Sequence, residues 1–481
     1  MRRGGSPLAT AAALGAGVAA VGALFPDSVA AHGIAVRGDL PLPPWLFAWA
    51  ASLVLVVSFV GLGTLWSQPR LEHHTPSREL PRPHARGLTS PLLEALLGAA
   101  SVALLGLTIY AGFAGSQVPT ENVGPTLVFV LFWVGIPFVS LLLGDVYRVL
   151  SPWRAIGRAA GTVLRRLGAR PLVASYPSRL GVWPALVGFI AFVTLELVVA
   201  EGSQPRTLAL ATIVYTLWAC IGMSLFGVET WSRNCDAFGV YFGLFARLSP
   251  WERRGRRVFL RPPLGGLARL APAPGLVPFV ATMIGSVTFD GAAESELWAS
   301  VGPSIARTIE KLGPAPGTAT QISSAIGLAL CVLLVWALYH LGIAGVRAAT
   351  GSGRAAELAA RFAPSLVPIA FAYVAAHYFS LLAFQGQAVG YLASDPLGRG
   401  SDLLGTADWQ VDYNAIGTAT LWYLQVGFVV AGHVAGLVLA HDRALALFRG
   451  AREALRSQYW MLAVMVFFTS LALWLLSQAN A

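Results

Sequence analysis

Long apolar stretches separated by short polar loops dominate this sequence. A bilayer core roughly 30 Å thick needs about 20 apolar residues of helix to cross it. We therefore expect a transmembrane helix in each of ten stretches that follow an apolar run near the N-terminus, at residues 46–66, 92–115, 126–149, 182–200, 207–228, 273–289, 322–346, 363–386, 414–440 and 459–478. The pattern predicts an all-α integral membrane protein with about ten transmembrane helices.

The sixth stretch, 273–289, is the weakest of the ten. It has Pro278 near its start and Asp290-Gly291 at its end, which leave only about 15 apolar residues between them. A short span and a re-entrant segment are both compatible with this length. A re-entrant segment would move the later arginine-rich loops to the outside, so loop charge favours a full crossing.

The N-terminal segment has the features of a cleavable secretory signal. Arg2 and Arg3 precede an apolar run, and Val29 and Ala31 occupy the two small-residue positions of a cleavage site. We expect a signal peptide at 1–31 and a single polytopic membrane domain at 32–481. The mature chain would then begin with His32 outside the membrane.

Loop charge supports this orientation. The predicted inner segments carry 26 arginines, whereas the outer segments carry five basic residues, which is the asymmetry of the positive-inside rule. It predicts that both mature termini lie outside a plasma membrane. The loops concerned are arginine-rich inner loops at 67–91, 150–181 and 229–272 and acidic outer loops at 290–321 and 387–413.

Composition narrows the class of partner. The chain is 56% hydrophobic and 12% charged, so a soluble core could not bury its apolar surface. A net charge of +10 would suggest nucleic acid in a soluble protein. Here the arginines flank apolar segments, which indicates anionic lipids at the inner face and no nucleic-acid partner. Three cysteines without a CxxC motif predict no disulfide framework.

A short motif occurs twice on the predicted inner face. Leu-Ser-Pro-Trp stands at 150–153 and again at 248–251, each time before an arginine-rich stretch. Serine caps helices and proline favours the first helical turn, while tryptophan and arginine suit the membrane interface. The repeat predicts a pair of interfacial helices that anchor the topology or dock an anionic lipid or a cytoplasmic partner.

Ionisable residues inside spans are costly and are candidates for function. For the histidines, hydrogen bonding between helices competes with metal binding, haem ligation and proton relay, and His340 with His433 is the candidate haem pair. No motif assigns a catalytic residue. The intramembrane polar candidates are Glu94, Asp145, Glu196, Glu229, His340, His377 and His433.

The predicted N-terminal histidine offers a metal site. A free His32 presents an amine and an imidazole to one ion, and such nitrogen ligands favour copper, with zinc next. The remaining ligands must come from the outer side, where His377 and the carboxylates Asp290, Asp408 and Asp412 are the candidates. We take His32, His377 and Asp290 as the candidate metal ligands.

Several short segments together carry a resemblance to a known family. They are Ala31-His32-Gly33, Asp39-Leu40-Pro41-Leu42-Pro43 with the Trp45-Leu46-Phe47-Ala48-Trp49 that follows, Gly144-Asp145-Val146-Tyr147-Arg148 with the Ser-Pro-Trp-Arg after it, and Val287-Thr288-Phe289-Asp290-Gly291. The chain resembles, over its whole mature length, a bacterial membrane-protein family labelled fenitrothion hydrolases. The resemblance implies a phosphotriester hydrolase acting on organophosphates. A metal would serve such a reaction by activating water.

Two further functions remain open on the sequence alone. A copper-binding or haem-containing redox protein would use His32 and the intramembrane histidines. A transporter would use Asp145, Glu196 and a broken sixth span.

Overall fold

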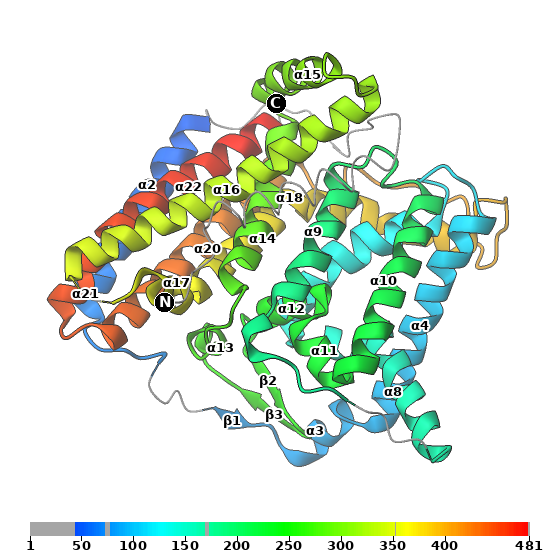
Figure 1. The fold of residues 1–481 in the computed structure, drawn as a ribbon, viewed down its shortest axis with the longest axis horizontal. Helices are drawn as coiled ribbons and strands as arrows, with labels where there is room; N and C mark the ends of the chain where they lie inside the picture. The colour runs from blue at the N-terminus through cyan, green and yellow to red at the C-terminus, as the bar shows by residue number, and fades with distance from the viewer. Residues whose placement is uncertain (1–43, 73–76, 169–172, 352, 480–481) are drawn as a thin grey trace.

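The computed structural model describes residues 44–72, 77–168, 173–351 and 353–479. The predicted signal peptide and His32 lie outside the described residues. Within them the protein is a bundle of helices with one small sheet (Figure 1). The longer helices are α2 (Pro44–Leu65), α4 (Pro91–Ala114), α8 (Pro152–Arg166), α9 (Trp183–Leu197), α10 (Pro205–Phe226), α12 (Ala237–Ala246), α14 (Leu276–Ala293), α15 (Glu296–Glu310), α16 (Pro316–Thr350), α18 (Val367–Gln385), α20 (Thr418–Leu447) and α22 (Tyr459–Ala479).

Shorter helices link or extend these elements. They are α3 (Arg82–Leu88), α5 (Val123–Pro125), α6 (Ile136–Leu143), α7 (Tyr147–Leu150), η2 (Ser178–Leu180), α11 (Val228–Asn234), α13 (Gly265–Ala268), α17 (Ala355–Phe362), η3 (Ala363–Leu366), η4 (Gly386–Ala388), α19 (Val389–Ser394) and α21 (Ala451–Ser457).

The helices confirm the membrane class of the protein. In the described part of the chain, eight helical segments are long and apolar enough to cross a bilayer, and the pair α21–α22, bent by 41°, would be a ninth. Each of the ten predicted stretches overlaps a helix, the first of them on the shorter apolar helix α2. The chain is therefore an all-α protein of multi-pass membrane type.

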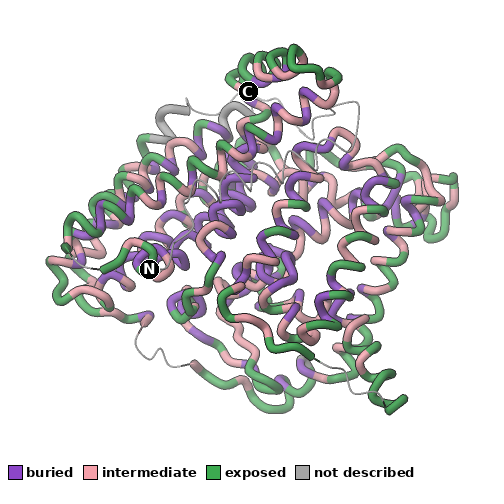
Figure 2. The backbone as a smooth tube through the Cα atoms, in the orientation of Figure 1, coloured by how far each residue is buried: buried purple, intermediate pink, exposed green. Residues whose placement is uncertain are grey.

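Two groups of helices meet along a central pair (Figure 1). On one side α2, α16, α20 and α22 run side by side, and on the other α4 and α10 pack together next to α9 and α12. Helices α14 and α18 lie between the groups and contact both. Burial follows this arrangement, since the purple segments of Figure 2 concentrate along the middle of the bundle.

Helix α14, the weakest of the predicted spans, is the central element. It is one continuous helix of 18 residues, and every residue from Phe279 to Phe289 is buried. At the rise of an α-helix, 18 residues cover about 27 Å, close to the thickness of the hydrocarbon core. The continuous helix agrees with the short span, the first of the two alternatives, and differs from the broken span that the transporter alternative would use. Its modest hydropathy reflects contact with protein on all sides, which replaces contact with lipid.

The predicted third span is shorter than expected. It begins with α5, continues as a π-helix, η1 (Thr126–Gly135), and then as α6, and ends at Gly144, whose φ of 87° only glycine adopts without strain. A side chain here would also approach Trp251, because an added Cβ would lie 3.1 Å from its carbonyl oxygen. Asp145 to Arg148 consequently leave the span and begin the next element.

The second copy of the Leu-Ser-Pro-Trp motif does not start a helix. The first copy does so as predicted, since the Ser151 side chain accepts from the Arg154 backbone N–H and α8 follows. After Ser249 the chain forms β2 (Trp251–Arg254) and β3 (Arg257–Leu260), and β1 (Arg78–Glu79) completes an antiparallel sheet ordered β1-β3-β2. Gly255, with φ of 64°, turns the hairpin. The predicted pair of interfacial helices is therefore wrong for the second copy.

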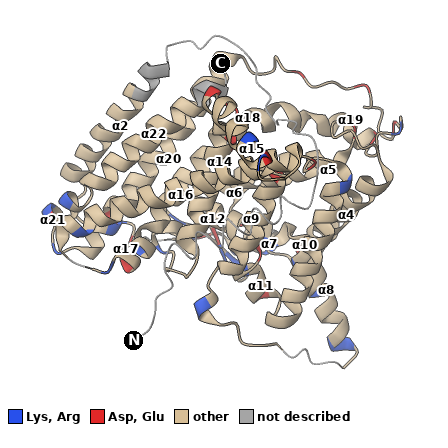
Figure 3. Ribbon diagram, turned by 45° about the horizontal axis from the view of Figure 1, so that its top comes forward, with Lys and Arg blue, Asp and Glu red and all other residues tan. Residues whose placement is uncertain are grey.

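The segment 229–272 contains more than the loop expected from its arginines. Its helix α12 is buried along its whole length apart from Gly239 and Gly243, and Tyr241, Phe242 and Phe245 are among the most buried side chains of the core. At ten residues α12 is too short to cross a bilayer. Basic residues mark one end of the bundle, because most of the blue ribbon in Figure 3 lies around α8, α11, α17 and α21.

Candidate functional site

An aspartate and a histidine from the two central helices meet at the end of the bundle near α15. Asp290 lies in the last turn of α14 and His377 lies in the middle of α18. The distance between His377 Nε2 and Asp290 Oδ2 is 2.9 Å, and their side chains are 16% and 20% exposed. Sequence reasoning named these two residues as partners, and the structure brings them together.

A tyrosine that sequence reasoning missed completes the group. The Tyr378 hydroxyl donates to the same Asp290 Oδ2 at 2.7 Å. His377 and Tyr378 are consecutive in α18, and their rings lie 4.8 Å apart at 79°. We call Asp290, His377 and Tyr378 the outer triad, after the side of the membrane that loop charge predicts for this end. The only advance signal for Tyr378 was its position beside the histidine, because a tyrosine in an apolar span is not unusual.

The bond to Asp290 defines which ring nitrogen of His377 is basic. An ionised carboxylate only accepts hydrogen bonds, so Nε2 carries the hydrogen and donates it. The lone pair of the neutral ring is then on Nδ1. This nitrogen faces α14, since a Cβ added at Gly291 would lie 3.8 Å from it. A histidine held in this way can serve as a general base or as a metal ligand.

A small cavity lies beside the histidine ring. Four helices, α14, α18, α20 and α22, contribute to its wall, and apart from His377 and Tyr373 the wall is apolar. The lining residues are Val287, Gly291, Tyr373, Ala376, His377, Val429, Ala472 and Leu475. At about 20 Å³ the cavity has room for about one water molecule beside the histidine ring.

The charges around His377 are negative. Asp290 and Glu294 are the charged groups of the described residues that act on it. Glu294 follows α14, and burial raises the pKa of its carboxyl, an effect to which Asp290 adds and which His377 opposes. A ligand with a negative charge would be repelled from this site.

Glu196 extends the acidic character inward. It lies near the end of α9, and its charge interacts with that of Asp290. The Trp133 indole N–H interacts with the Glu196 carboxyl, and the Tyr241 hydroxyl is buried without a hydrogen-bond partner among the described residues. The rings of Trp133 and Tyr241 stack at 4.5 Å, and Trp133 belongs to the π-helical turn of η1, a type of local structure common at functional sites.

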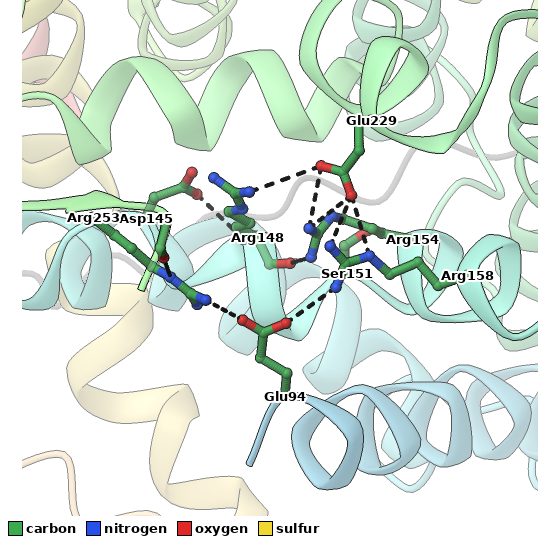
Figure 4. Close-up of polar contacts among 9 residues, drawn as sticks. Glu94, Asp145, Arg148, Ser151, Arg154, Arg158, Glu229 and Arg253 are labelled. Carbon is green, nitrogen blue, oxygen red and sulfur yellow. Dashed lines mark hydrogen bonds and ion pairs between the residues drawn. The ribbon is translucent and has the colours of Figure 1, made fainter. Parts of the chain in front are cut away.

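Three other candidates join an arginine network at the opposite end (Figure 4). Glu229 binds Arg154 and Arg158, each at 2.9 Å, and Glu94 binds Arg158 at 3.1 Å and also Arg253. The Asp145 carboxylate accepts from the Arg148 backbone N–H at 3.2 Å. We call these residues the inner network, after the side that loop charge predicts for the arginine-rich loops. They connect α4, α8, α11 and β2.

Electrostatics in the inner network favours the ionised pairs. Burial disfavours the charged form of Glu229, but Arg154 and Arg158 outweigh it and hold the pKa of that carboxyl below its usual range. Arg154 is 5% exposed, so its charge depends on this partner. Glu94 and Glu229 therefore hold α8 against the bundle. They lie at the end of the bundle opposite to the outer triad.

The two other candidate histidines, His340 and His433, bond within their own helices. His340 Nδ1 donates to the Trp336 carbonyl at 2.9 Å, and His433 Nδ1 donates to the Val429 carbonyl at 2.8 Å. The structural role weighed for both residues was a hydrogen bond between helices, whereas these bonds stay within α16 and α20. The described residues contain no group of three histidine, cysteine or carboxylate side chains placed to hold a metal. Asp290, and not Asp408 or Asp412, is the described carboxylate bonded to His377.

Comparison with known proteins adds no assignment. No family model, curated protein or solved structure matches the chain.

Proposed function

We propose that the protein is a ten-span plasma-membrane protein with both mature termini outside and the outer triad near the external surface. The arginine-poor end of the bundle carries α15 and the triad, while the opposite end carries the inner network. The positive-inside rule makes the inner network cytoplasmic. This orientation gives external solutes access to His377.

The function that this geometry supports best is hydrolysis of an uncharged ester, with a phosphotriester as the expected class. The single observation that carries the proposal is the bond of 2.9 Å between His377 Nε2 and Asp290 Oδ2 beside an apolar cavity. The carboxylates around the ring disfavour anionic phosphate diesters. A neutral triester avoids this repulsion, and it also partitions into the bilayer next to the site.

The residues suggest a reaction sequence. His377 Nδ1 accepts a proton from water while the water oxygen forms a bond to phosphorus and the bond to the leaving alkoxide or phenoxide breaks. The imidazolium returns the proton to the leaving group. Asp290 holds the ring orientation and stabilises the imidazolium, as a carboxylate does in a hydrolytic triad. Tyr378 positions Asp290.

A metal-binding function is the second candidate, and one observation favours it. A histidine ligand characteristically donates its other ring N–H to a carboxylate, as His377 does to Asp290. His377 Nδ1 with the amine and imidazole of His32 would supply three nitrogen ligands for copper or zinc. This metal would either activate the water of hydrolysis or be carried by the protein as its ligand.

One pair of assays separates the two functions. The purified chain in lipid nanodiscs is tested for hydrolysis of a chromogenic phosphotriester and is also analysed for copper and zinc. Hydrolysis that persists after chelation and disappears in His377→Ala supports metal-free catalysis by the outer triad. Stoichiometric metal that is lost in His377→Ala supports the metal site. Hydrolysis unaffected by His377→Ala contradicts the proposed site.

A further inference from the structure

Helix α8 has one half fixed to the bundle and one half that projects from it (Figure 1). Its first residues, Pro152 to Arg154, are buried, and Arg154 and Arg158 bind Glu229. Ala155 packs on α4, where a Cβ added at Gly98 would lie 3.0 Å from its own Cβ. From Arg158 onward every residue of α8 except Gly161 is exposed. The inner network therefore determines the direction in which the second half points.

The projecting half has an apolar face that no described residue covers. Its larger side chains belong to Val163, Leu164 and Leu167, which are 56%, 44% and 76% exposed. With Ile156 and Ala160 they recur every three or four residues, which places them on one side of the helix. An apolar face of this size beside the ends of membrane spans fits the interfacial region of a bilayer.

The arginines of the two halves differ in their partners. Arg154 and Arg158 in the fixed half are paired with carboxylates. Arg165 and Arg166 in the projecting half make no ion pair within the described part of the chain, and the bond given for Arg165 is to the Thr162 hydroxyl at 3.0 Å. Two positive charges are thus available next to the apolar face.

We propose that the second half of α8 is a binding surface for anionic phospholipid of the inner leaflet. Val163, Leu164 and Leu167 insert at the level of the upper acyl chains, and Arg165 and Arg166 bind the headgroup phosphate. Arginine suits this role because its long stem stays along the apolar surface while the guanidinium reaches the phosphate. The surface is separate from the outer triad and does not depend on hydrolysis.

The test measures binding of phosphatidylglycerol and phosphatidylcholine to the detergent-purified full chain by native mass spectrometry. Each arginine near an anionic surface contributes about fivefold in affinity, so Arg165→Gln with Arg166→Gln weakens phosphatidylglycerol binding by about 30-fold. Arg165→Lys with Arg166→Lys retains most of it. The matched control is Arg347→Gln with Arg354→Gln, which removes two exposed arginines on the same side that form no described ion pair.

The outcomes distinguish the proposal from a general effect of charge. Specific loss in the Arg165/Arg166 variant, with phosphatidylcholine binding unchanged, supports it. Equal loss in the control pair overturns it, because the effect would then depend on net charge alone. Unchanged phosphatidylglycerol binding in the Arg165/Arg166 variant also overturns it and would direct attention to a cytoplasmic protein as the occupant of this face.

Discussion

His377 and Asp290 are 87 residues apart in the chain, yet their side chains meet at 2.9 Å on the two central helices of the bundle. The contact requires α14 to run its full length, because Asp290 lies in its last turn. It also requires α18 to present consecutive residues, His377 and Tyr378, to the same carboxylate oxygen. The weakest span in the sequence thus supplies the anchor of the candidate site.

Asp290→Asn tests the role assigned to the carboxylate. The amide keeps the size of the side chain but removes the charge that stabilises the imidazolium, and its NH2 group can donate to Nε2 and so favour the opposite tautomer. We expect the rate of phosphotriester hydrolysis to fall by at least about 100-fold. Initial rates in nanodiscs give the measurement. Tyr378→Phe should cost less, about tenfold, because it removes one positioning bond; equal losses in both variants would contradict this ranking.

Glu229→Gln tests the inner network. The change leaves Arg154 buried with a neutral partner, and we expect a loss of about 1–3 kcal/mol in the free energy of unfolding. The lower part of that range applies, because the Glu229 side chain is 49% exposed. Thermal unfolding in detergent measures the loss. Glu310→Gln is the control, since Glu310 makes no ion pair among the described residues; the same loss there would exclude a specific role for Glu229.

The stability lost in Glu229→Gln should depend on pH with a definite sign. The arginines hold the pKa of Glu229 below the ordinary value of 4.5 in the folded state. Its stabilising contribution is therefore complete above pH 4.5 and disappears as the pH falls through the lowered pKa. The difference in stability between the wild type and Glu229→Gln should be largest near neutral pH and shrink in acid. A difference that grows as the pH falls would contradict the pairing.

Asp442 makes a third testable anchor. Its carboxylate accepts from the Trp66 indole and from the backbone N–H groups of Arg70, Leu71 and Glu72, which attaches the loop after α2 to α20. The residue is 1% exposed. Asp442→Ala leaves these donors without an acceptor and should cost about 3–5 kcal/mol. The second measurement is proteolysis of residues 66–72, which should be faster in the variant. Unchanged cleavage would contradict the attachment of this loop to α20 by Asp442.

The helices followed from the sequence because hydropathy reports the environment of about 20 residues at once. The features that sequence reasoning missed depend on contacts between distant segments. The helix α12 is too short to register as a span, and the strand after Ser249 shares its local motif with the helix after Ser151. Propensity alone could not separate the two, because Trp251 to Arg254 is extended through pairing with Arg257 to Leu260.

The candidate site was predictable only in part, because it too depends on contacts between distant segments. His377 and Asp290 were named together because each is a rare polar residue assigned to the outer half of the bundle. Tyr378 and the partners of Glu229 were not named, because helix packing decides which side chains face one another. The metal hypothesis centred on His32 remains a prediction.

The most direct test of the account compares wild type with His377→Gln in matched nanodiscs, using a neutral phosphotriester and the corresponding anionic diester. Glutamine retains a hydrogen-bond donor for Asp290 but cannot act as a base near neutral pH. We predict that the wild type hydrolyses the triester and acts far less on the diester, and that His377→Gln lowers the triester rate by at least about 100-fold. Equal triester rates for wild type and His377→Gln would contradict the outer triad as the site of hydrolysis.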